Sequence, residues 1–248
     1  MFAIYKKEMR SYFTNPIGYV FCGIFLAFSA ILCCYTTILS KSYDTSAYFT
    51  LMIFALVILI PLLTMRLFSE EKKMRTEQLL LTAPVTLTGM VMGKFCAAFS
   101  LFFSCVAVSC INLIPLYVIA AAERGNMAYD TTYVGPATAE IIGCMIGMVF
   151  IGAAFIAIGT FISSFAENQL AAAITTMAVM VALTGIGIIS NFINVYWIRV
   201  VISWISVVDR FENFSQGIFD ISAIVYFVSL AFLFIFLTVR VYEKRRWS

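Results

Sequence analysis

The chain has 248 residues, of which 62% are hydrophobic and 12% are charged, with a formal net charge of +3. Soluble domains are roughly half apolar and about a quarter charged, so this composition excludes an ordinary soluble protein and indicates an integral membrane protein. The sequence contains no histidine, which excludes haem and His-ligated metal sites. The seven cysteines lie in or beside apolar runs without a CxxC motif, as expected for reduced, buried side chains.

The N-terminal residues 2–14 predict an amphipathic elbow helix rather than a membrane span. Phe2, Tyr5, Met9 and Phe13 recur at helical spacing, and basic residues occupy another face. Such a helix lies in the membrane surface, with its basic side towards the lipid headgroups. The alternative is a disordered basic N-terminus.

Six later runs are apolar and long enough to cross a bilayer as helices, which takes about 20 residues. Runs of this length, without ten-residue alternation, favour helices over a β-barrel. Pro61 and Pro115 can each kink the helix that contains them. We therefore expect an all-α polytopic membrane protein, a single domain over residues 1–248, with these six spans: Ile17–Leu39, Tyr48–Met65, Phe95–Ala122, Ile141–Phe165, Leu170–Ile193 and Ile221–Val239.

The positions of lysine and arginine predict the orientation of these spans. With six spans, twelve of the sixteen basic residues fall on one side, and the other four are Lys41, Arg124, Arg199 and Arg210. Both termini and the loop between the second and third spans are therefore expected to be cytoplasmic, in a plasma membrane. The twelve are Lys6, Lys7, Arg10, Arg66, Lys72, Lys73, Arg75, Lys94, Arg240, Lys244, Arg245 and Arg246.

The largest charged island of the chain is the loop Phe68–Pro84. It is expected to form a helix, with Ser69 as N-cap and Glu70 and Glu71 near the positive end of the helix dipole. Two pairs at i,i+4 spacing, Glu71–Arg75 and Lys73–Glu77, support the helix, and Pro84 ends it. The loop is interpreted as a docking helix for a soluble protein, or else as a solvated connection without a partner.

Small and polar residues inside the spans predict helix packing. Gly143 and Gly147 form a GxxxG pattern in the fourth span, which suits either packing within the subunit or a seam between subunits. Asn112 in the third span is expected to hydrogen-bond between helices, with a substrate contact as the other possibility.

Residues 194–220 predict a short helical segment on the outer side. The apolar stretch Val200–Val208 has nine residues, too few to cross the membrane. The tryptophans of this segment, Trp197 and Trp204, favour an interfacial or re-entrant segment. The basic tail 240–248 is interpreted as a stop-transfer segment that ends the last membrane span.

The motifs of common enzymes are absent from the sequence. The closest approach to a phosphate-binding loop, Gly89 to Lys94, has the wrong glycine spacing and is followed by Phe95 instead of Ser or Thr. No GxSxG or HExxH motif and no carboxylate pair within a span occurs. We expect no catalytic site, no cofactor, no metal and no nucleic-acid partner.

Three segments resemble a known family. Tyr5–Tyr19 is similar to the elbow helix, Met65–Val85 to the first cytoplasmic loop, and Phe211–Asp220 to the segment before the last span of type-two ATP-binding-cassette (ABC-2) exporter permeases, in the gliding-motility and NosY-like branch. The resemblance covers the chain in order and length. One departure is that Met74-Arg75 stands where the family usually has a small residue and a glycine.

The resemblance implies an exporter half whose pathway is formed by two permease subunits, identical or not. A separate ABC ATPase subunit would hydrolyse ATP and act on the coupling loop 68–85. The residues implied in that coupling are Glu70, Glu71, Arg75, Thr76, Glu77 and Leu80. The alternative from another class is a non-transporting membrane scaffold or regulatory subunit that uses the same loop to recruit a soluble partner.

Overall fold

The computed structural model of the chain describes residues 1–40, 42–76, 86–126, 135–190, 204 and 206–247. This part is mostly helical, and no strand occurs in it. In chain order the elements are α1 (Phe2–Thr14), α2 (Pro16–Cys33), η1 (Cys34–Leu39, a π-helical segment), α3 (Ser46–Thr64), α4 (Ser69–Lys73), α6 (Leu87–Ser109), η2 (Cys110–Leu113, a 3-10 segment), α7 (Ile114–Asn126), α8 (Thr138–Phe165), α9 (Gln169–Ser190), α11 (Val207–Ser215) and α12 (Ile221–Trp247).

Six helical runs among the described residues are long and apolar enough to cross a membrane, which confirms the all-α polytopic membrane fold. Each coincides with one of the predicted spans, although the boundaries differ. These runs are Pro16–Leu39, Ser46–Lys73, Leu87–Glu123, Thr138–Phe165, Gln169–Gly187 and Ile221–Arg246.

The third span begins eight residues earlier than the sequence predicts. Its helix α6 starts at Leu87, capped by the Thr86 hydroxyl, which accepts a hydrogen bond from the Gly89 amide. The prediction placed Lys94 in the loop and began the span at Phe95, but Lys94 lies inside α6. The same span is interrupted by η2, which ends two residues before Pro115, whereas α3 runs through Pro61 without interruption.

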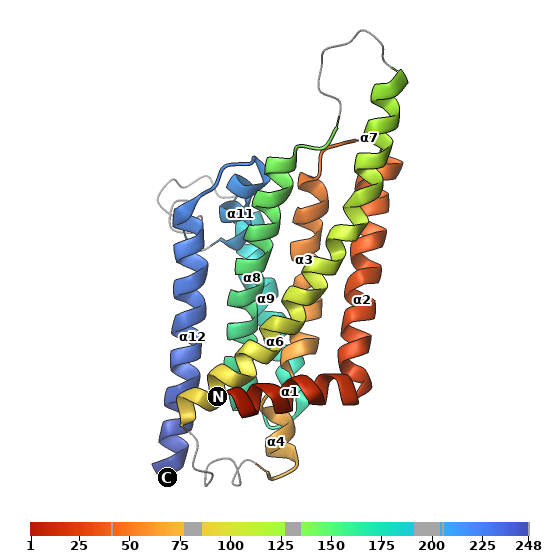
Figure 1. Ribbon diagram of the computed structural model, residues 1–248. Helices are drawn as coiled ribbons and strands as arrows, with labels where there is room; N and C mark the ends of the chain where they lie inside the picture. Colours follow the sequence, from red (N-terminus) through yellow and green to blue (C-terminus); the bar gives the residue numbers. More distant parts are fainter. Residues whose placement is uncertain (41, 77–85, 127–134, 191–203, 205, 248) are drawn as a thin grey trace.

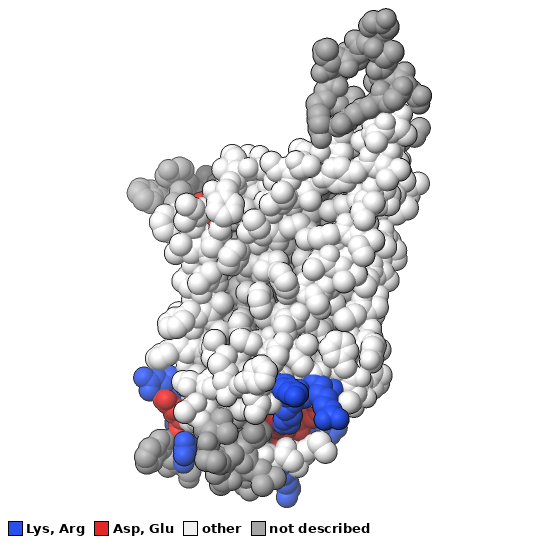
Figure 2. Space-filling model, in the orientation of Figure 1, with Lys and Arg blue, Asp and Glu red and all other residues white. Residues whose placement is uncertain are grey.

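The spans form an upright bundle, and α1 lies across one end of it (Figure 1). At that end lie both chain termini, α4 and the last turns of α12 (Figure 1). All twelve basic residues that the sequence assigns to one side belong to elements at this end, which we call the basic end. Figure 2 shows lysine and arginine gathered there, whereas the middle of the visible face carries no charged side chain.

Helices α3 and α8 form the centre of the bundle. Helix α8 packs against α3, α6, α9, α11 and α12, and small residues allow the closest approaches. A Cβ atom on Gly152 would lie 2.1 Å from the Phe102 ring of α6, and one on Gly159 would lie 2.3 Å from the Thr64 hydroxyl of α3. Because the neighbouring side chains already fill that space, these positions of α8 admit only glycine without rearrangement.

The elbow helix α1 has the predicted bounds, but its buried face agrees only in part with the prediction. Ile4 and Tyr12 are its buried residues, whereas Phe2 is 76% exposed and Phe13 is 45% exposed. The residues of the predicted apolar face are divided: Tyr5 and Met9 are partly buried against the core, whereas Phe2 and Phe13 remain on the surface of the bundle. The buried face of α1 is the one that contacts α6 and α2. The periodicity of one helix does not specify where its neighbouring helices lie.

The last two elements also differ from the sequence expectation. Helix α12 continues through the basic tail to Trp247, beyond Val239, where the last span was predicted to end. Helix α11 begins at Val207, where the predicted apolar stretch 200–208 ends; most of that stretch lies outside the described residues.

Candidate functional site

The charged segment after α3 folds as a short helix rather than the long one predicted. Helix α4 spans only Ser69–Lys73, and Phe68 occupies the N-cap position assigned to Ser69. The Ser69 hydroxyl donates instead to the Met65 carbonyl, one turn back. The first amides of this segment, those of Phe68 and Ser69, instead donate to the Ser163 hydroxyl of α8.

The chain leaves α4 through a left-handed turn. Arg75 has φ = 56°, the one positive φ found at a non-glycine residue in the described part of the chain. This conformation costs an L-residue roughly 1–2 kcal/mol, and glycine adopts it freely. The Thr76 amide then closes the turn by donating to the Glu71 carbonyl, at 2.9 Å.

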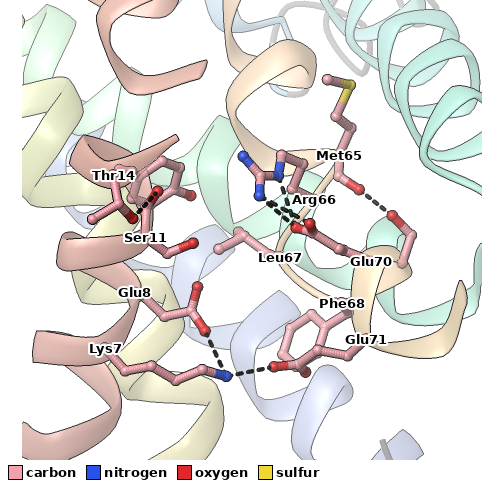
Figure 3. Close-up of polar contacts among 12 residues, drawn as sticks. Lys7, Glu8, Ser11, Thr14, Met65, Arg66, Leu67, Phe68, Glu70 and Glu71 are labelled. Atoms are coloured by element: carbon pink, nitrogen blue, oxygen red, sulfur yellow. Dashed lines mark hydrogen bonds and ion pairs between the residues drawn. The ribbon is translucent and has the colours of Figure 1, made fainter. Parts of the chain in front are cut away.

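Two neighbouring carboxylates of α4 point in different directions (Figure 3). Glu70 accepts two hydrogen bonds from the Arg66 guanidinium, at 2.8 and 2.9 Å, and so fixes the turn between α3 and α4. Glu71 forms no helical pair with Arg75, contrary to the prediction, because α4 ends before Arg75. Its carboxylate lies 2.8 Å from the Lys94 ammonium and 3.3 Å from that of Lys7.

Lys94 is the centre of a buried ion cluster. Its side chain is 1% exposed and lies 3.3 Å from Glu8 of α1 in addition to Glu71 of α4. The ammonium also donates to the Leu67 carbonyl and lies over the Phe68 ring, 4.9 Å from its centroid. Three elements far apart in sequence, α1, α4 and α6, are thereby joined at one cation.

Lys7 completes the cluster at its exposed edge. It lies 3.7 Å from Glu8 and 3.3 Å from Glu71, so two ammonium groups face two carboxylates and the formal charges balance. Partial burial acts to lower the pKa of Lys7, but the Glu71 and Glu8 carboxylates outweigh it and raise that pKa above its ordinary value. Lys7 is therefore charged at neutral pH.

Helix α4 is also anchored to the end of α8. The Ser163 hydroxyl of α8 accepts hydrogen bonds from the amides of Phe68 and Ser69, at 3.2 and 3.4 Å. Lys72 donates to the carbonyls of Ser164 and Ala166, where α8 ends. A lysine at these carbonyls satisfies acceptors that no helical amide reaches and complements the negative end of the α8 dipole.

An aromatic contact adds α12 to this junction. The Phe68 ring, 1% exposed, packs on Tyr242 of α12 with the ring centroids 5.0 Å apart. Helix α4 is thus held by α1, α6, α8 and α12 together. We call this set of contacts the α4 junction: Lys7, Glu8, Phe68, Glu71, Lys72, Lys94, Ser163 and Tyr242.

The structure brings together only some of the residues expected in coupling. Glu70, Glu71 and Thr76 lie in or directly after α4, and Arg75 is exposed in its left-handed turn. Glu77 and Leu80 lie outside the described residues. Sequence reasoning missed Lys94, Glu8 and Lys7. The sequence did contain one indication of this cluster. Glu8 shares a helix face with the apolar residues Ile4 and Tyr12, at four-residue spacing, which indicates that its carboxylate has a buried partner.

The expected packing residues lie inside the subunit. A Cβ on Gly147 would meet the Phe211 ring of α11 at 3.0 Å, and one on Gly143 would meet the Phe214 carbonyl at 3.2 Å. The Asn112 side-chain amide donates to the Ser29 hydroxyl of α2 at 2.9 Å, and that hydroxyl is also hydrogen-bonded to Tyr48 of α3. Asn112 therefore links neighbouring spans.

The chain was compared with known proteins by sequence. No protein-family model matches it, and no curated protein matches it either.

Proposed function

We propose that this chain is the membrane-spanning permease subunit of an ABC-type exporter. In this role it forms part of the substrate pathway and is driven by a separate ATP-hydrolysing subunit through residues 68–85. The six spans, the elbow helix and the resemblance of three segments to ABC-2 permeases support the proposal. The lack of a nucleotide-binding motif in the sequence accords with an ATPase on another chain.

The observation that carries the proposal is the α4 junction. A coupling element has to transmit force, so it must be attached rigidly to the helices that move. Helix α4 is joined to α6 and α1 through Glu71 and Lys94, to α8 through Lys72 and Ser163, and to α12 through Phe68. A solvated connecting loop would need none of these buried contacts.

The proposed arrangement has the basic end in the cytoplasm of a plasma membrane. Twelve basic residues on elements at that end favour this orientation by the positive-inside rule. Helix α4 then faces the compartment that holds ATP. A second permease subunit, identical or not, completes the pathway across the membrane.

Co-purification tests the proposal. The full chain, expressed with an ABC ATPase subunit from the same organism, is expected to hold that ATPase and to raise its hydrolysis rate. The chain alone is expected to hydrolyse no ATP. Glu77→Lys reverses a charge at the expected contact, where such losses cost about 2–5 kcal/mol, or roughly 30-fold or more in affinity. The matched control is Glu167→Lys, an exposed carboxylate in the turn between α8 and α9 at the same end.

The outcomes separate the two classes of function. Loss of the ATPase from Glu77→Lys but not from Glu167→Lys supports coupling through this segment. A partner that binds without any change in hydrolysis and without transport into inverted vesicles indicates a scaffold or regulatory subunit. Wild-type binding and transport by Glu77→Lys would remove the coupling role from that position.

A further inference from the structure

The elbow helix α1 presents different side chains on each of its faces. At 3.6 residues per turn, Ile4, Glu8 and Tyr12 form the inward face, packed against the bundle. Lys6 and Arg10 lie on the opposite face and are exposed. This outward face has no role in the α4 junction, so its charges need another explanation.

The two flanks of α1 show where this outward face lies relative to the membrane. On one flank Phe13 packs on Tyr19, in the first turn of the span α2, with ring centroids 5.7 Å apart. Phe2 is exposed on the same flank. On the other flank Lys7 reaches Glu71 of α4. Lys6 and Arg10 therefore lie between an apolar flank at the spans and a charged flank at the basic end, which is the level of lipid headgroups.

Lys6 and Arg10 are available to a ligand. In the described part of the chain neither forms an ion pair, in contrast to Lys7, Arg66 and Lys94. They are one helical turn apart, so their Cβ atoms are about 5–6 Å from each other. Both side chains can reach one phosphate group, the guanidinium by a two-pronged hydrogen bond and the ammonium as a point charge.

A depression of about 510 Å³ lies over these side chains and is lined by Ala3, Lys6, Lys7, Arg10, Ser11 and Thr14. Ala3, one turn before Lys6, adds only a methyl group to this lining. We propose that this depression binds the headgroup of an anionic phospholipid, with its phosphate between Lys6 and Arg10 and its acyl chains beside Phe13 and Tyr19.

Charge complementarity selects this occupant. Of the three basic residues in the lining, Lys7 is balanced by Glu8 and Glu71, but Lys6 and Arg10 are not, and no lining residue is acidic. A zwitterionic headgroup would therefore bring a cation into an already positive depression. Each basic residue near an anionic membrane surface strengthens binding by about fivefold. The adjoining aromatic flank supplies the apolar contact that a soluble phosphate compound could not use. The proposal is independent of the transport function and stands if that function fails.

Native mass spectrometry of the purified full chain tests the site. The protein in neutral detergent is titrated with phosphatidylglycerol or phosphatidylcholine, and bound lipid is counted. Wild type is expected to prefer phosphatidylglycerol. Lys6→Gln/Arg10→Gln should bind it about 25-fold more weakly, because two charges are lost. The control Lys73→Gln/Lys244→Gln removes two exposed charges from the same end and should bind as wild type does.

Three results would overturn the proposal: equal binding of the two lipids by wild type, wild-type binding by the Lys6/Arg10 double variant, or the same loss in the control. Thermal unfolding in detergent shows whether the variants fold, and unchanged midpoints are expected because neither side chain has an ion-pair partner among the described residues. Should the double variant unfold, Lys6→Gln and Arg10→Gln are measured singly, each with an expected loss of about fivefold.

Discussion

The buried ammonium group of Lys94 in α6 holds α1 and α4 together through its ion pairs. Its ammonium is removed from water at a helix that crosses the membrane, and such a charge is tolerated only with partners at close range. Glu71 at 2.8 Å and Glu8 at 3.3 Å supply them. Breaking a buried pair costs more than the pair contributes, because the remaining charge stays uncompensated.

Lys94→Met is expected to destabilise the protein by about 3–5 kcal/mol, since it leaves Glu8 and Glu71 buried with Lys7 as their remaining cation. The measurement is the thermal midpoint in detergent. Lys94→Met/Glu71→Gln, which removes one charge of each sign, should regain most of the loss because Glu8 retains Lys7. The control Lys73→Met, at an exposed position of α4, should be nearly neutral. Equal midpoints for Lys94→Met and wild type would show that the cluster does not hold the junction.

Because the phenol of Tyr12 is buried, we expect the stability of the folded protein to fall at alkaline pH. Burial, aided by the Glu8 carboxylate, raises the pKa of its phenol above the ordinary value. The folded state therefore keeps the phenol neutral, whereas the unfolded state ionises near pH 10, and the stabilisation present below that pH is lost as the pH rises further. The loss amounts to about 1.4 kcal/mol per pH unit.

Tyr12→Phe removes this contribution. We expect its thermal midpoint to fall less than that of wild type between pH 9.5 and about pH 11, a range set by the ordinary tyrosine pKa. The raised pKa of Lys7 acts in the same direction and remains in the variant, so some decline should persist. Parallel pH curves for the two proteins would contradict the prediction.

Helix α8 is the element on which the bundle depends. Its glycines meet different neighbours along its length: α11 at Gly143 and Gly147, α6 at Gly152, and α3 at Gly159. In lipid the hydrophobic effect gives little attraction between helices, so close packing at such small residues supplies much of it. The same surface seats α11, so the GxxxG pattern is used within the subunit.

Gly152→Ala is expected to be the most disruptive of the conservative substitutions in α8, because the new Cβ would lie 2.1 Å from the fully buried Phe102 ring. Overpacking of this kind typically costs about 1–3 kcal/mol. Gly23→Ala in α2 is the matched control, since nothing lies within 4 Å of its Cβ; there alanine should be neutral or slightly stabilising. Thermal unfolding in detergent distinguishes them, and equal midpoints would refute the packing argument.

The molecule as a whole separates charge by position along the bundle axis. Its two termini, α1, α4 and the last turns of α12 share the basic end, and the visible face between the ends is free of charge (Figure 2). An even number of spans brings the termini to the same end. The positive-inside rule then predicts which end faces the cytoplasm.

Cysteine labelling in intact cells tests this orientation. On a background without the seven native cysteines, residues introduced at Ser42 and Asn126 should react with a membrane-impermeant maleimide added from outside. Residues introduced at Lys73 and Lys244 should react only after the cells are permeabilised, which also serves as the accessibility control. Labelling of Lys73 from outside would invert the orientation and remove the proposed access of helix α4 to the compartment that holds ATP.

The sequence by itself determined the elements whose cause is local. Hydropathy located all six spans, since a segment that leaves water must be apolar over the thickness of the bilayer. Pro115 marked the interruption of the third span, and the bounds of α1 agree with the prediction. The twelve-to-four division of basic residues required only counting.

Tertiary structure decided the features that depend on partners distant in the chain. Lys94 ended the predicted span because a lone charge opposes insertion, but Glu8 and Glu71 neutralise it and the helix extends to Leu87. Glu71 forms its ion pair with Lys94 of α6 and not with Arg75. Ile4 and Tyr12 face inward because α6 and α2 lie on that side of α1. Periodicity reports which residues share a face of a helix, whereas only packing selects the face to be buried and the charges that meet there.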